Sequence, residues 1–64
     1  MNVTQKQILQ NVLDKDQGHW VMVGHKREWQ AGAKLVEAGI LKVVVVKRRD
    51  SDGEVCGHLL QFNI

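Results

Sequence analysis

Apolar residues recur at helical spacing in two segments of the chain and at strand-like spacing in three others. The first segment, residues 4–15, has four apolar positions on one helical face: Ile8, Leu9, Val12 and Leu13. This pattern predicts an amphipathic helix that packs on a core. Thr4 and Gln7 have the spacing of a capping box, with Thr4 as the N-cap. Val3 and Ile8 are expected to form a hydrophobic staple at the same helix start.

A short strand and a second helix are predicted next. Residues 19–23 are rich in β-forming side chains and end at a glycine, which is typical of a strand. From residue 25 to residue 38 the apolar period becomes helical again. Gly39 then supplies a left-handed residue that ends the helix, and Ile40 is expected to pack back on Leu35 in a Schellman motif.

The last third of the chain predicts a β-hairpin. Residues 41–49 and 54–64 flank Asp52–Gly53, a dipeptide that suits a two-residue type I′ turn. With that turn, the apolar face of the hairpin has these expected cross-strand pairs: Leu41 with Ile64, Val43 with Phe62 and Val45 with Leu60. Gly57 is expected to relieve crowding or to mark a bulge.

These elements assemble into an α+β domain of order α-β-α-β-β. A crossover helix makes the first two strands parallel, and the third strand fits between them, antiparallel to both, in the order 1-3-2. Two helices cover one face of this three-stranded sheet. The pattern leaves open whether Trp20 and Met22 or Val21 and Val23 point inwards. The other expected core residues are Leu9, Trp29, Leu35 and Phe62, and we expect both tryptophans to be core residues rather than stacking platforms for nucleic acid.

Length and composition exclude several classes of protein. A chain of 64 residues, 44% of them apolar, forms a single domain over residues 1–64 and leaves much of its apolar surface exposed. The longest apolar run, Val43–Val46, is too short to span a membrane, and the start lacks the pattern of a signal peptide. A lone Cys56 allows no internal disulfide. We therefore expect a cytoplasmic protein, for which homodimerisation is one means of burying further surface.

The formal net charge is only +2, but its distribution is uneven. Basic residues gather at the start of the second helix and near the tip of the hairpin. Lys26 and Arg27 occupy the first helical turn, where the helix dipole disfavours cations. A nearby phosphate would compensate that unfavourable placement. Acidic residues lie close to the same surfaces and oppose phosphate binding there: Glu28, Glu37, Asp50, Asp52 and Glu54.

The order of elements resembles a winged-helix DNA-binding domain. The resemblance lies in the N-terminal helix, the short strand, the helix end at residues 34–41 (Lys-Leu-Val-Glu-Ala-Gly-Ile-Leu) and the basic terminal hairpin. One helix of the family is missing, because residues 24–39 hold only one. The resemblance implies a transcriptional regulator or accessory factor that binds duplex DNA, in which residues of the second helix read bases and the wing contacts phosphate or the minor groove. The implied DNA-binding residues are Lys26, Arg27, Gln30, Lys34, Lys47, Arg48 and Arg49.

Other functions fit the sequence less closely. The alternative is a small inhibitor or adaptor, of the kind that phages and mobile elements encode, that binds a partner protein through a sheet edge or an apolar sheet face. Val44, Val46 and Leu59 are the candidate residues of that face. Cys56 and His58 lack the paired spacing of zinc sites, so we expect no metal or other cofactor. No acid–base constellation predicts an enzyme.

Overall fold

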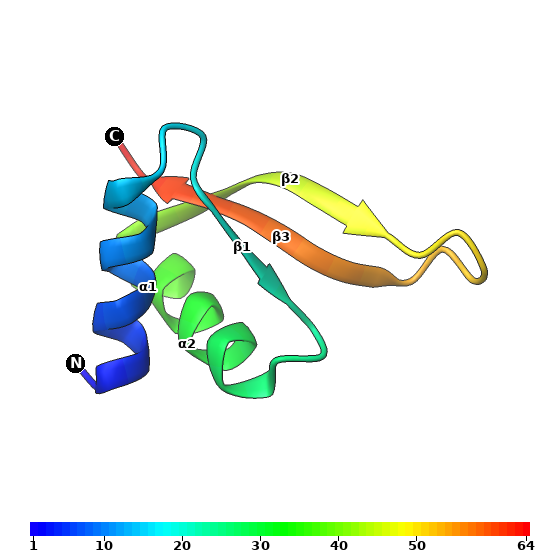
Figure 1. The fold of residues 1–64 in the computed structure, drawn as a ribbon, viewed down its shortest axis with the longest axis horizontal. Coiled ribbons are helices and arrows are strands. Elements are labelled where there is room, and N and C mark those ends of the chain that lie inside the picture. The colour runs from blue at the N-terminus through cyan, green and yellow to red at the C-terminus, as the bar shows by residue number, and fades with distance from the viewer.

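The computed structural model describes all 64 residues and confirms the predicted α+β order. Its elements are α1 (Val3–Asp14), β1 (His19–Met22), α2 (Lys26–Glu37), β2 (Leu41–Arg48) and β3 (Val55–Phe62). The molecule measures 34 × 22 × 19 Å. Figure 1 shows why one dimension dominates: the β2–β3 hairpin projects well beyond the end of the molecule that holds the helices.

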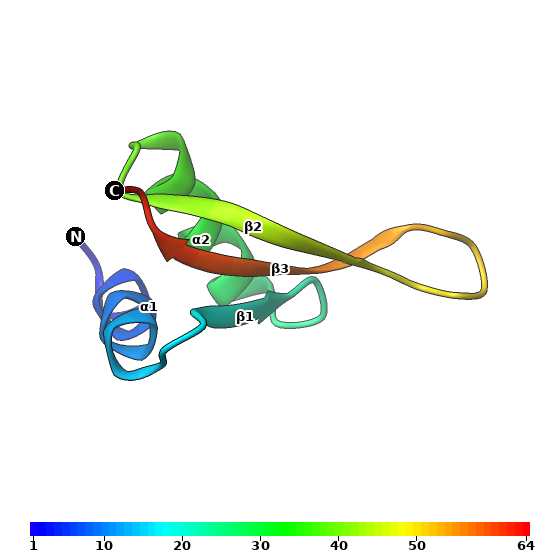
Figure 2. The same ribbon diagram turned by 90° about the horizontal axis from the view of Figure 1, so that it is seen from above.

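The sheet has the predicted order β1-β3-β2. The central strand, β3, is antiparallel to both neighbours, so that β1 and β2 run in the same direction at the two edges. Figure 2 shows β3 between the edge strands. The crossover from β1 to β2 is made by α2 alone, which packs against both edge strands and against α1. No second helix lies in this crossover, so the fold has only one helix where a winged helix has two.

The start of α1 differs from the prediction by two residues. Asn2, not Thr4, is the N-cap: its side chain accepts a hydrogen bond from the Gln5 amide, and the Gln5 side chain accepts one from the Asn2 amide. Asparagine caps a helix at least as well as threonine, and the earlier start adds half a helical turn. The predicted staple is also wrong, because Val3 is 78% exposed.

The end of α2 confirms the predicted Schellman motif. Gly39 has a φ of +79°. Its amide donates to the Val36 carbonyl, and the Ile40 amide donates to the Leu35 carbonyl. These two bonds satisfy carbonyls that the helix itself leaves free. They also fix the direction in which the chain enters β2.

The hairpin forms, but its predicted turn and register are wrong. The loop comprises the four residues 50–53, since the amides of Gly53 and Arg49 bond to the carbonyls of Arg49 and Glu54. Asp52 favours this longer loop because its carboxylate accepts from both the Glu54 amide and the Arg49 guanidinium. Leu41 therefore pairs with Phe62 and Val43 with Leu60, before register shifts between Val43 and Val45 and between Lys47 and Arg48.

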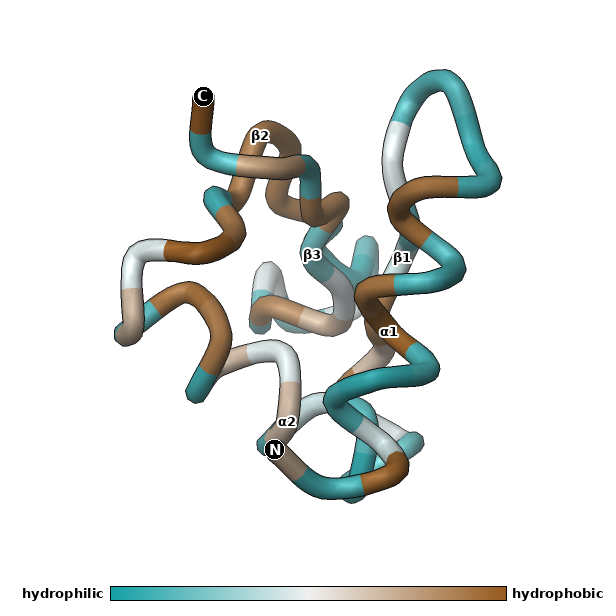
Figure 3. The backbone as a smooth tube through the Cα atoms, turned by 90° about the vertical axis from the view of Figure 1, so that its left-hand side faces the viewer, coloured by the Kyte–Doolittle hydropathy of each residue, from teal (hydrophilic) through white to brown (hydrophobic).

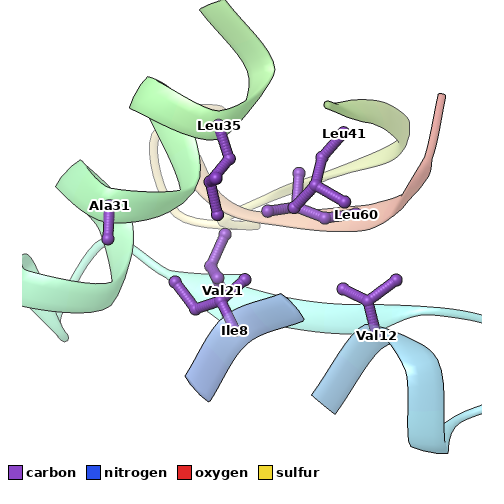
Figure 4. Close-up of a cluster of buried hydrophobic side chains, with 7 residues drawn as sticks. All are labelled: Ile8, Val12, Val21, Ala31, Leu35, Leu41 and Leu60. Atoms are coloured by element: carbon purple, nitrogen blue, oxygen red, sulfur yellow. The ribbon is translucent and has the colours of Figure 1, made fainter. Parts of the chain in front are cut away.

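The core lies between the helices and one face of the sheet. Figure 4 shows the seven buried apolar side chains: Ile8, Val12, Val21, Ala31, Leu35, Leu41 and Leu60. Val21 points inwards, which settles the orientation of β1. The prediction that Trp20 belongs to the core is wrong, because Trp20 remains 40% exposed. Four of the expected or neighbouring apolar residues are partly buried around the core: Leu9, Trp29, Val36 and Phe62.

Two glycines allow close approach of neighbouring elements. A β-carbon on Gly18, whose φ is +105°, would collide with the Leu60 carbonyl oxygen. At Gly57, a β-carbon would lie 2.8 Å from the Met22 sulfur, beside the register shift at Lys47. Gly57 therefore both relieves crowding and lies beside a bulge. Neither α1 nor α2 has the length and apolar character of a membrane-spanning helix.

Candidate nucleic-acid interface

Three of the predicted DNA-binding residues lie together on α2. Arg27, Gln30 and Lys34 are exposed and follow one another along the same side of the helix. They line a hollow of about 440 Å³ between α2 and the first turn of α1. The other lining residues are Asn2, Val3, Thr4 and Ala31. No acidic residue lines this hollow, so its charged groups are all cationic.

The N-terminus of α1, which is the positive end of its dipole, borders the same hollow. Among the first amides of α1, the Gln5 amide donates to the Asn2 side chain and the Lys6 amide donates to the Asn2 carbonyl. The amides of Val3 and Thr4 make no hydrogen bond within the protein. Free amides at a helix N-terminus attract anions, and here they lie beside two unpaired cationic side chains. This arrangement favours an oxyanion such as a phosphate group.

The acidic residue nearest to Arg27 in sequence is held by another partner. Oε1 of Glu28 lies 3.0 Å from Nε2 of His19 on β1. Nδ1 of the same ring lies 3.1 Å from the ammonium of Lys15. A neutral imidazole with its proton on Nε2 satisfies both contacts, since it donates to Glu28 and accepts from Lys15. Arg27 forms no ion pair, and its charge is available to a ligand.

Lys26 is exposed in the first turn of α2 but does not line the hollow. Successive residues of an α-helix are separated by about 100° around its axis. Lys26 is thus rotated away from Arg27 and makes no ion pair. It adds positive charge beside the three-residue surface without belonging to it.

The three basic residues of the hairpin lie in a different electrostatic setting. Arg49 forms a bidentate ion pair with Asp52, with its shorter contact at 2.7 Å. Arg48 donates to the Gly53 carbonyl, while Lys47 is exposed opposite Gly57. Lys47, Arg48 and Arg49 are balanced by Asp50, Asp52 and Glu54, so residues 47–54 carry no net charge. The whole formal charge of +2 therefore resides in the rest of the chain.

The structure separates the two predicted halves of the interface. The α2 residues lie at the helical end, beside the N-terminus of α1, whereas Arg48 and Arg49 lie near the tip of the projecting hairpin (Figure 1). We define Arg27, Gln30 and Lys34 as the α2 surface, and Lys47, Arg48 and Arg49 as the wing surface. The α2 surface is the more cationic of the two, because its charges have no acidic partner.

Sequence reasoning missed the contribution of α1 and the role of Glu28. Asn2 and Thr4 come close to Lys34 only through the packing of α1 on α2. The contact between His19 and Glu28 joins a strand to a helix, and no motif spacing encodes it. The signal present in the sequence was limited to the capping chemistry at the start of α1, which indicates where that helix begins.

The remaining candidate groups do not form a cluster that could hold a metal ion. No group of three or more histidine, cysteine or acidic residues lies close enough to hold a metal ion. The His58 ring stacks on Trp29, with the ring centroids 4.5 Å apart. Cys56 is free and half-buried. His58 is thus used in packing between β3 and α2.

The chain was compared with known protein families, proteins and structures. No protein-family model, no curated protein and no solved structure matches the chain. The function must therefore be inferred from the residues of the chain themselves.

Proposed function

We propose that the protein binds duplex DNA through the α2 surface. The observation that supports this proposal most directly is the hollow beside Arg27 and Lys34, which has cationic side chains, free helix amides and no acidic residue. Phosphate contacts supply most of the affinity of a small DNA-binding protein. The resemblance to a winged helix supports the same proposal independently, through the order of the elements.

Within this proposal the three residues have different tasks. Arg27 and Lys34 contact phosphates on either side of the hollow, and the free amides of α1 add neutral hydrogen-bond donors. Gln30 lies between them and has both a donor and an acceptor, which is what recognition of a base edge requires. Lys26 adds long-range attraction. Such a protein acts as a regulator or an accessory factor on DNA.

The wing surface has a secondary part in this proposal. Lys47 and Arg48 contact the DNA backbone, while the charge of Arg49 is largely neutralised by Asp52. Because residues 47–54 are electrically neutral, their contribution is local and short-ranged. We therefore expect loss of the wing cations to weaken binding less than loss of the α2 cations.

A salt titration of duplex binding tests this order of importance. Each phosphate contact contributes about −0.9 to the slope of log K against log salt concentration. We expect Arg27→Ala with Lys34→Ala to reduce the magnitude of the slope by roughly 2. The matched control is Lys15→Ala with Lys42→Ala, which removes two cations that line a different hollow together with Asp16. Equal losses in both double variants would refute a localised interface, as would no binding at low salt.

The triple change of Lys47, Arg48 and Arg49 to alanine measures the wing surface in the same assay. We expect a smaller change of slope than for the α2 double variant, although three cations are removed rather than two. A larger change would show that the hairpin, and not α2, dominates the contact with DNA.

The second candidate function is a protein-binding module that uses the sheet. One observation favours it: all four residues Val43–Val46 are between 36% and 46% exposed. Figure 3, which is coloured by hydropathy, shows the apolar character of β2. This strand lies at an edge of the sheet. Exposed apolar side chains grouped on one element are typical of interaction surfaces.

A further inference from the structure

The face of the sheet opposite the helices carries a row of apolar side chains across all three strands. Trp20 of β1 and Val45 of β2 both pair with Leu59 of β3, so the three side chains lie on one face. Val21 and Leu60, the neighbours of Trp20 and Leu59, point to the opposite face and into the core. We call the row Trp20, Leu59 and Val45 the outer row.

No helix covers the outer row. The core residues place both helices against the Val21 face, and Figure 1 shows α2 on one side of the sheet with no helix on the other. Trp20 is 40% and Val45 is 45% exposed. A sheet face of this kind is normally buried by a second layer, often a helix. The outer row therefore lacks a covering layer within this chain.

The charged residues of the strands around the outer row are all basic; Asp16, which follows α1, lines a hollow with Lys42 but forms no ion pair with it. Lys42 pairs with Gln61, and Lys47 pairs with Gly57, on the two sides of the row along the strands. Neither lysine forms an ion pair. The three strands contain no aspartate or glutamate at all. The surface is thus an apolar centre between two free lysines.

This charge pattern argues against a second copy as the covering layer. Two copies that stacked their outer rows would bring the lysines of both copies to one interface, with no acidic strand residue to neutralise them. Antiparallel pairing of two β2 edges in the register that sets Val44 opposite Val45 would likewise place Lys42 opposite Lys47 of the other copy. A partner with acidic residues around an apolar stripe has the complementary pattern.

We infer that the outer row binds an acidic amphipathic helix of another protein. The apolar stripe of that helix covers Trp20, Leu59 and Val45, and its flanking carboxylates meet Lys42 and Lys47. This inference rests on the second candidate function and specifies the chemistry of the partner. It uses none of the α2 surface, and it shares only Lys47 with the wing surface of the DNA proposal.

Two synthetic peptides test the inference. Both are helices of about 14 residues, long enough to be ordered on binding, with leucines along one face. One carries glutamates at all other positions and the second carries lysines there. Binding is measured at low salt by the NMR signal of the Trp20 indole N–H, assigned by its loss in Trp20→Phe. We expect the glutamate peptide to bind about tenfold more tightly than the lysine peptide, and to shift the Trp20 signal.

A matched pair of variants locates the preference. Lys47→Glu is expected to abolish the tenfold ratio, whereas Lys6→Glu, an equal change of charge on an exposed residue of α1, is expected to preserve it. Binding of neither peptide would overturn the second candidate function itself. Equal binding of both peptides would overturn only the acidic nature of the partner. A Trp20 signal that shifts with protein concentration, together with a dimer in light scattering, would identify a second copy as the occupant and also overturn the inference.

Discussion

Oε1 of Glu28 on α2 lies 3.0 Å from Nε2 of His19 on β1, and this contact joins α2 to the sheet. The His19 side chain is only 11% exposed. The contact fixes α2 on β1. Glu28 also follows Arg27 in the chain and lines a hollow with it, so its negative charge lies beside the α2 surface although the two side chains form no ion pair.

Replacement of Glu28 separates its structural contact with His19 from the effect of its charge. We expect Glu28→Ala to lower the free energy of unfolding by about 1 kcal/mol through loss of the hydrogen bond. Glu28→Gln keeps an acceptor for His19 and is expected to cost less. Both variants remove one negative charge from α2 and should bind duplex DNA more tightly at low salt. Urea titration measures the first effect, and fluorescence anisotropy measures the second. Unchanged affinity in both variants would show that Glu28 does not oppose DNA binding.

The tip of the hairpin allows a test of the ion pair between Arg49 and Asp52. Asp52→Asn keeps a side-chain oxygen for the Glu54 amide but releases the charge of Arg49. The pair is exposed, so we expect a stability change below about 1 kcal/mol. Duplex affinity should rise, and the salt slope should become steeper by up to about 0.9. Asp50→Asn removes the same charge without releasing Arg49. A rise of equal size in both variants would mean that only net charge matters.

Three glycines provide a graded test of the backbone geometry. A β-carbon added at Gly24 would meet no atom within 4 Å, and the backbone there has no positive φ, so Gly24→Ala should be nearly neutral. Gly53 has a φ of +73° in open space, and alanine there should cost about 1–2 kcal/mol. Gly18→Ala adds a collision with the Leu60 carbonyl and should cost the most. Urea unfolding gives the order, and a Gly18→Ala protein as stable as Gly24→Ala would contradict the contact between β3 and the start of β1.

The orientation of β1 is tested by two neighbouring residues. Val21 is 2% exposed and belongs to the core. Val21→Ala should therefore lower the free energy of unfolding by about 1–3 kcal/mol, in proportion to the buried methyl groups that are removed. Trp20→Ala removes a larger side chain but should cost less, because Trp20 is 40% exposed and lies outside the core cluster, so that its removal leaves no cavity in the core. The reverse order, measured by thermal or urea unfolding, would show that Trp20 faces the core.

The sequence predicted those features that local chemistry determines. Helix periodicity located both helices, and Gly39 located the end of α2, because a left-handed residue at that position has a direct structural consequence. The strand order followed from the short connections and the handedness of the crossover. These features depend on neighbours in the chain, so they can be recognised without tertiary contacts.

Features that depend on tertiary contacts could not be predicted in the same way. The hairpin register depends on Asp52, whose carboxylate binds Arg49 and the Glu54 amide and thereby favours a longer loop than Asp52–Gly53 alone suggests. The inward position of Val21 depends on which face of β1 the helices cover. The α2 surface was predicted correctly as an exposed group, but its hollow is completed by Asn2 and Thr4 through helix packing.

We expect Arg27, Gln30 and Lys34 to contact duplex DNA together. The most direct measurement is NMR titration of the isotope-labelled protein with a short duplex, following the side-chain signals of these residues and the amides of Val3 and Thr4. We predict that these signals shift together and saturate at low salt, with smaller shifts at Lys47 and Arg48. Shifts confined to the outer row, or no shifts at low salt, would contradict the claim.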